Sequence, residues 1–208
     1  MRNLSQTDEF EMIWQWAYAE YESERFGKLY GLPTEIKQKL ASNNSNELTP
    51  GERIALRAQV LGVRGPLLKG LVGLGVRWHT ATFDHSDLSD IKIMNWPPFV
   101  AIASSRKLSD FVAMLDKGVS PPNDEFLNTY RKMKARFSLT DMHGSPILVS
   151  KTTDGPYILV EGYSRLTALT SKHETGVLKE VTFPVVLGVS QNLQGWFLNG
   201  DRYSIPLF

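Results

Sequence analysis

The order of elements between residues 146 and 190 constrains the fold of this chain more than any other feature. The stretch SPILVSKTTDGPYILVEG holds two runs of β-forming residues around an Asp-Gly turn, which predicts a hairpin of two strands. A Glu-Gly pair at 161–162 ends the second run, and a helix is predicted from Tyr163 to near Gly176. The run VTFPVVLGVS predicts a further strand. Elements in this order predict an α/β (α+β) fold.

The junction at residues 161–165 combines groups that suit an anion. The first N–H groups of a helix lack partners within the helix, and the helix dipole places partial positive charge there. Gly162 lets another group approach the backbone, and Ser164 and Arg165 add a hydroxyl and a guanidinium. These features predict a phosphate-binding site. Plain helix capping beside a surface arginine is the alternative interpretation.

Two other residues of this junction also have two interpretations. Glu161 either orders a cation or a water molecule beside the phosphate, or simply pairs with Arg165. Tyr163 either stacks on a base or fills the core. The sequence leaves both choices open.

The segment from about residue 124 to 190 resembles the ParB N-terminal/sulfiredoxin superfamily. In that superfamily a strand of the form Pro-Ile-x-Val precedes a turn and a second strand that ends in a Gly-containing motif. A helix that begins with an arginine and a strand of the form Pro-Val follow. The matching stretches here are residues 146–149, 159–169 and 184–186. The resemblance implies a mixed sheet with flanking helices. The N-terminal 70 residues lie outside it.

The resemblance implies nucleotide binding at Gly162, Ser164 and Arg165, and we include Tyr163 in the predicted site. It implies that the ligand is ATP or another nucleotide, bound with Mg²⁺. The implied reaction is phosphoryl transfer or nucleotide hydrolysis, with Arg165 and Glu161 as candidate catalytic residues. Sulfiredoxin chemistry needs a cysteine, and the chain has none. Ser164 replaces the first of two basic residues that partition proteins carry, which argues against a partition clamp.

A cluster of acidic residues and imidazoles lies between residues 79 and 90. Asp84, His85 and Asp87 are the candidate ligands of a divalent cation, with His79 and Asp90 close by in the sequence. The same side chains at this spacing also suit capping and turn formation.

Basic residues concentrate in a helix predicted from residue 124 to about 137. Arg131 and Lys134 share one face of this helix, and Lys132 and Arg136 share another. Such a helix suits contact with nucleic-acid phosphates, although a solvated face also explains it. The formal net charge of +1 gives the whole molecule no strong attraction for polyanions.

Two alternative functions therefore stand beside the nucleotide-binding one. The first is a non-catalytic DNA- or protein-binding factor of a plasmid, phage or defence system. The second is a metal-dependent nuclease on the same fold.

We expect two regions along the chain. A helical N-terminal extension covers residues 1–75, and the ParB/sulfiredoxin-like domain covers 76–208. Helices are predicted at 7–26, 34–40, 50–60 and 107–118, and strands at 76–83, 91–96 and 99–103. Five glycines between residues 62 and 75 predict a bend between helices.

Composition adds limits on location. The chain is 42% hydrophobic, which is enough for a real core. Its N-terminus is acidic and lacks an apolar stretch typical of a signal peptide, and no apolar run approaches the roughly 20 residues that span a bilayer. These observations predict a cytoplasmic protein with no membrane contact. They leave the oligomeric state open.

Overall fold

A six-stranded mixed sheet forms the centre of the molecule. The computed structural model describes residues 3–21, 31–68, 70–71, 73–120, 124–138 and 142–196, without the side chains of 66, 124, 125 and 195. The strands are β1 (Ser5–Thr7), β2 (Arg77–Asp84), β3 (Ile91–Ile93), β4 (Ile147–Ser150), β5 (Tyr157–Glu161) and β6 (Thr182–Val189). Their order across the sheet is β1-β2-β6-β4-β5-β3.

Both pairing senses occur in this sheet. The pairs β1–β2, β2–β6 and β4–β5 are antiparallel, whereas β6–β4 and β5–β3 are parallel. The last strand along the chain, β6, lies between β2 and β4. This arrangement confirms the predicted α/β class with a mixed sheet and flanking helices.

Alternating apolar residues bury both faces of the sheet. Leu148 and Leu159 belong to one hydrophobic core, whereas Val149 and Ile158 belong to the other. Successive side chains of a strand point to opposite faces, so a strand buried on both faces is apolar at every position. The strand β4 shows this pattern at Ile147, Leu148 and Val149, and its fourth residue, the polar Ser150, is also buried.

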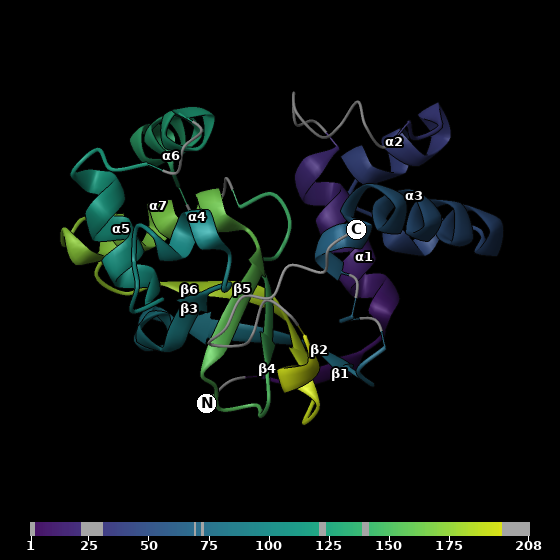
Figure 1. Cartoon of the computed structure of the whole chain (residues 1–208). Helices are drawn as coiled ribbons and strands as arrows, with labels where there is room; N and C mark the ends of the chain where they lie inside the picture. Colours follow the sequence, from purple (N-terminus) through teal and green to yellow (C-terminus); the bar gives the residue numbers. More distant parts are fainter. Residues whose placement is uncertain are drawn as a thin grey trace.

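Helices cover each face of the sheet, which gives three layers (Figure 1). The core on one face includes residues of α5 (Leu108–Asp116), α6 (Asp124–Arg136) and α7 (Tyr163–Glu174). The core on the other face includes residues of α1 (Glu9–Glu20), α2 (Thr34–Ala41) and α3 (Pro50–Leu68). The short α4 (Pro97–Val100) follows β3, and 3₁₀ turns occupy Ser45–Glu47, His85–Asp90 and Leu193–Gly195.

The N-terminal helices pack directly on the sheet. The short strand β1 pairs with β2, and Met12 and Trp16 of α1 share a core with Val149 and Val160. Ion pairs join the N-terminal helices to one another, including Arg57–Glu9 and Lys39–Glu52. The predicted boundary at residue 75 stays a prediction, but this core contains residues from both sides of it.

Several local predictions are confirmed. Helix α2 begins at Thr34 as expected, and the hairpin of β4 and β5 is formed. The Thr49 backbone N–H donates to the Glu52 carboxylate at 2.7 Å, and the Glu52 N–H donates to the Thr49 hydroxyl at 3.3 Å. This reciprocal capping box starts α3. The predicted helix over 7–26 is described only to residue 21, and α1 ends at Glu20.

The predicted glycine bend is wrong at its first two positions, because α3 continues to Leu68. Gly62 and Gly65 lie within this helix, where an added Cβ would meet no atom within 4 Å. Each glycine costs an exposed helix about 1 kcal/mol relative to alanine. Burial of Leu56, Val60 and Leu68 in the core outweighs that cost.

The predicted strand at 99–103 is also wrong. Pro97 and Pro98 occupy the first positions of α4, where a missing backbone N–H does no harm. Trp96 is the residue before the helix, and turns follow α4 at residues 101 and 102. The two prolines therefore start a helical turn and do not simply stop a strand.

No helix among the described residues is long and apolar enough to cross a bilayer.

Replacement of Gly62 by alanine tests the corrected extent of α3. We expect Gly62→Ala to raise the free energy of unfolding by about 0.5–1 kcal/mol, because alanine has the higher helix propensity and the site has room. Gly176→Ala is the matched control: Gly176 has a φ of +73°, so alanine there should be destabilising. Urea unfolding measures both variants. Destabilisation by Gly62→Ala would favour a bend at this position.

Candidate functional site

The strand–helix junction at residues 161–165 is built as the sequence predicts. The strand β5 ends at Glu161, Gly162 has a left-handed φ of +99°, and α7 begins at Tyr163. An added Cβ on Gly162 would lie 3.0 Å from the Cβ of Pro146 and 3.3 Å from Nη2 of Arg165. Only glycine satisfies both the backbone angle and this close packing. No side chain that the structure describes caps the start of α7.

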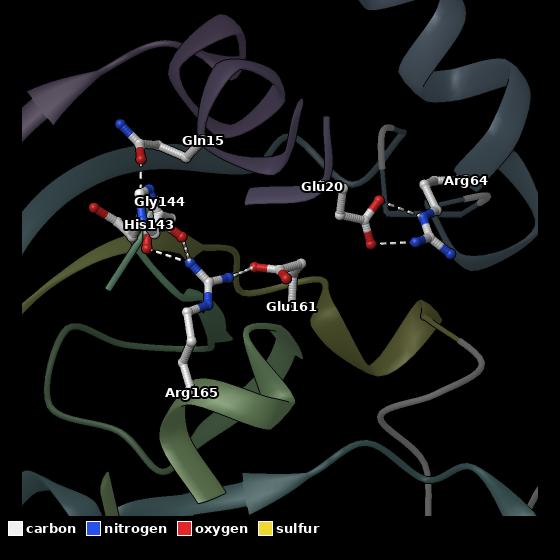
Figure 2. A network of polar contacts seen from close by, with 8 residues as sticks. Gln15, Glu20, Arg64, His143, Gly144, Glu161 and Arg165 are labelled. Carbon is white, nitrogen blue, oxygen red and sulfur yellow. Dashed lines mark hydrogen bonds and ion pairs between the residues drawn. The ribbon is translucent and has the colours of Figure 1, made fainter. Parts of the chain in front are cut away.

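Arg165 points into the protein and not toward an open surface. Its exposed fraction is 6%. Its Nη1 donates to the backbone carbonyls of His143 and Gly144, and its Nη2 forms an ion pair with the Glu161 carboxylate (Figure 2). The guanidinium therefore binds three acceptors of the protein itself.

The ion pair between Glu161 and Arg165 is almost completely buried. The side chains are 14% and 7% exposed, respectively. Burial raises the pKa of the Glu161 carboxyl above its ordinary value; the Arg165 charge opposes this shift, and the Glu20 carboxylate adds to it. Of the two roles predicted for Glu161, pairing with Arg165 is the one that the structure contains.

A second buried ion pair lies beside the first (Figure 2). Glu20 of α1 binds Arg64 of α3, whose Nε donates to the carboxylate at 3.1 Å. Both side chains are less than one fifth exposed. The Glu20–Arg64 pair joins two N-terminal helices, whereas the Glu161–Arg165 pair joins the end of β5 to α7.

The loop bound by Arg165 also contacts α1. The Ser145 backbone N–H donates to Oε1 of Gln15 at 2.8 Å, and Nδ1 of His143 lies 3.5 Å from the Tyr18 hydroxyl. An added Cβ on Gly144 would lie 2.8 Å from the Gln15 carbonyl, so the loop lies tightly against the helix. Arg165 thus helps to hold the surface on which α1 packs.

The other predicted nucleotide ligands lie at the same junction. The Tyr163 hydroxyl donates to the Leu159 carbonyl at 2.9 Å and accepts from the Met94 N–H at 2.8 Å. Its ring packs 4.8 Å from the ring of Phe99 between centroids, so Tyr163 fills the core at this position. Burial raises the pKa of its hydroxyl. Ser164 lies in the first turn of α7 and is half-buried.

Two surface hollows stand out in the described part of the chain, and neither includes a residue of 161–165. One, of about 310 Å³, lies where β1 and the start of α1 meet residues 75–78. The other, of about 450 Å³, lies between α5, α6 and α7. The junction at residues 161–165 therefore lies outside both hollows.

The residues predicted to bind a cation form a helix cap. Asp84 accepts hydrogen bonds from the Ser86 backbone N–H at 2.8 Å and from the Ser86 hydroxyl. Asp87 accepts from the Asp84 N–H at 2.9 Å, which completes a capping box. His85 lies beside this cap, and its ring packs against that of His173. Within the described ranges, no three metal-binding side chains converge.

The basic residues of α6 divide into two groups. Arg131, Lys132 and Arg136 are exposed. Lys134 is half-buried, and its Nζ lies 2.6 Å from the Asp116 carboxylate of α5. Arg131 and Lys134 line the 450 Å³ hollow together with Lys172 of α7, as their shared face predicts. Lys132 and Arg136 do not line it.

Sequence reasoning missed the partners of the buried charges. No local pattern marks Glu20, Arg64 or Gln15 as a candidate, and Asp116 is predicted only as part of the helix over 107–118. Arg64 is 44 residues from Glu20, and Gln15 is 130 residues from Ser145. No local spacing signals such distant contacts.

Comparisons of this chain with protein-family models, curated proteins and solved structures found no match. The resemblance to the ParB/sulfiredoxin superfamily therefore stays a prediction.

Removal of the Arg165 guanidinium tests its structural role. We expect Arg165→Ala to lower the free energy of unfolding by about 3–5 kcal/mol, because Glu161 is left as an unpaired buried carboxylate. Two backbone carbonyls also lose their donor. Chemical unfolding gives this quantity.

Arg57→Ala is the control for an exposed ion pair. Arg57 and its partner Glu9 are 46% and 32% exposed, so this substitution should cost at most about 1 kcal/mol. Equal decreases in the free energy of unfolding for the two substitutions would contradict the role we give to Arg165.

Proposed function

We propose that this chain is a non-catalytic binding protein that contacts an anionic partner, either DNA or an acidic protein surface, through the cations of α6. The observation that carries this proposal is a contrast between two sets of cations. The Arg165 guanidinium is buried and bound to acceptors of the fold, whereas Arg131, Lys132 and Arg136 are exposed on one helix.

The low net charge is compatible with a local contact of this kind. Exposed charges are screened beyond about 10 Å at 0.1 M salt, so a partner at the surface of α6 responds chiefly to nearby groups. The helix places four cations within six residues. Of these, only Lys134 forms an ion pair with a side chain that the structure describes.

Charge reversal on α6 tests the proposal. We expect the protein to be retained on a heparin column at low salt and to elute as the salt concentration rises, because cation–polyanion contacts weaken with salt. The double variant Lys132→Glu/Arg136→Glu should elute at clearly lower salt.

Lys37→Glu/Lys151→Glu carries the same change in net charge on exposed residues away from α6, and it should elute with the wild type or close to it. Absence of retention would remove the support for α6 as the contact surface. An equal decrease in the elution salt concentration of the two double variants would do the same.

Nucleotide binding at residues 161–165 is the second candidate function. Gly162 has the left-handed conformation, and the first turn of α7 has no side-chain cap among the described residues, which favours an anion at this position. The phosphate would have to replace Glu161 as the partner of Arg165. Disruption of a buried ion pair costs about 3–5 kcal/mol, and this cost would weaken binding by a factor on the order of 10²–10⁴.

A thermal-shift assay with ATP, CTP, GTP or ADP plus Mg²⁺ distinguishes the two functions. The lead proposal expects no nucleotide response. The second candidate expects stabilisation that grows in Glu161→Gln, since the weaker partner leaves the guanidinium more available to phosphate. The nuclease alternative stays a prediction.

A further inference from the structure

The hollow between α5, α6 and α7 is an open groove with an apolar floor and a basic rim. We refer to it as the α5–α7 groove. Its lining includes Leu115, Asp116, Arg131, Lys134, Ala135, Lys172 and Val177. Its volume is about 450 Å³. Figure 1 shows these helices on the face of the sheet opposite α1 and α3.

Apolar groups in the groove are accessible to a partner. Val177 is 66% exposed, and Ala135 is also exposed. Leu115 also lines the groove and belongs to the core. An exposed valine beside a hollow gives an apolar side chain of a partner a surface to cover.

The carboxylate within the groove is already engaged by the protein. Asp116 accepts hydrogen bonds from the Tyr130 hydroxyl, from Lys134 at 2.6 Å and from the Ser171 hydroxyl at 2.9 Å. Burial alone would raise the pKa of Asp116, but these three donors outweigh it and hold the pKa below the ordinary value. The Asp116–Lys134 pair therefore contributes little net charge to the groove.

Two further cations give the groove a positive charge, which the nearby Glu174 carboxylate of α7 partly offsets. Arg131 is exposed and has no ion-pair partner among the side chains that the structure describes. Lys172 donates to the Phe137 carbonyl at 3.0 Å, and an ammonium group has two more N–H donors. Arg131 and Lys172 come from different helices, α6 and α7, and line one groove.

We propose that the α5–α7 groove binds an acidic segment of a partner protein that also carries large apolar side chains. This inference rests on the proposed function, because it assigns the anionic partner of α6 to a chemical class. The carboxylates of the segment would pair with Arg131 and Lys172, and its apolar side chains would cover Val177 and Ala135. A DNA backbone matches the cations equally well, but it brings no apolar group to the floor.

Fluorescence anisotropy with the full chain and three labelled probes tests this inference. The first probe is an amphipathic peptide with Glu and Asp on one side and Leu and Phe on the other. The second has the same acidic residues, with Ser in place of Leu and Phe. The third is a short DNA duplex. We expect the first probe to bind at least about tenfold more tightly than the second.

Two single variants locate the binding to the groove. Arg131→Glu should weaken binding of the first probe by about tenfold, and Val177→Ser should weaken it by a smaller factor of roughly three. Ile54→Ser is the control for Val177, because Ile54 is 71% exposed on α3, on the other face of the sheet. Lys37→Glu is the control for Arg131. Circular dichroism of each variant checks that the exposed substitutions leave the fold intact.

The outcomes separate this inference from the proposed function. Equal binding of the first and second probes would overturn the inference, as would binding of the duplex without the first peptide. Retention on heparin that depends on α6 would leave the proposed function standing in both cases. If none of the three probes binds and the protein is not retained on heparin, the inference and the proposed function are both overturned.

Discussion

The buried guanidinium of Arg165 is the interaction on which the centre of the molecule depends. It joins the end of β5, the start of α7 and the loop at residues 143–144, and that loop contacts α1. A guanidinium has five N–H donors in a fixed plane, so one side chain can bind acceptors from several segments at once. The same geometry that suits a phosphate here serves the protein's own carboxylate and carbonyls.

Much of the fold was predictable from the sequence, because its signals are local. The alternation and apolar runs of β2, β4, β5 and β6, and the Thr49–Glu52 cap, each depend on residues close together in the chain. The two errors arose where tertiary packing decides. Gly62 and Gly65 are helical because the other side of α3 is buried, and Pro97 begins a helical turn despite the β-forming residues that follow it.

The position of the candidate site was predictable from the sequence, but the burial of its charged side chain was not. Residues 161–165 do form a strand–glycine–helix junction, and the sequence identified Arg165 as its principal charge. Whether that charge faces solvent or the interior depends on Glu161, on the 143–144 carbonyls and on the packing of α1 above them. The sequence offered pairing with Glu161 as one interpretation, but it gave no measure of burial.

The position of β6 in the sheet bears on how the protein acquires its structure during synthesis. This strand is the last of the six to leave the ribosome, yet it lies between β2 and β4 and pairs with both. Until it emerges, those two strands present unpaired edges, and the partners that close the sheet are about 100 residues apart along the chain (Arg77 with Val189). Pairings of such long range form slowly. A nascent chain that lacks β6 therefore exposes open strand edges. Chaperones shield surfaces of this kind from aggregation.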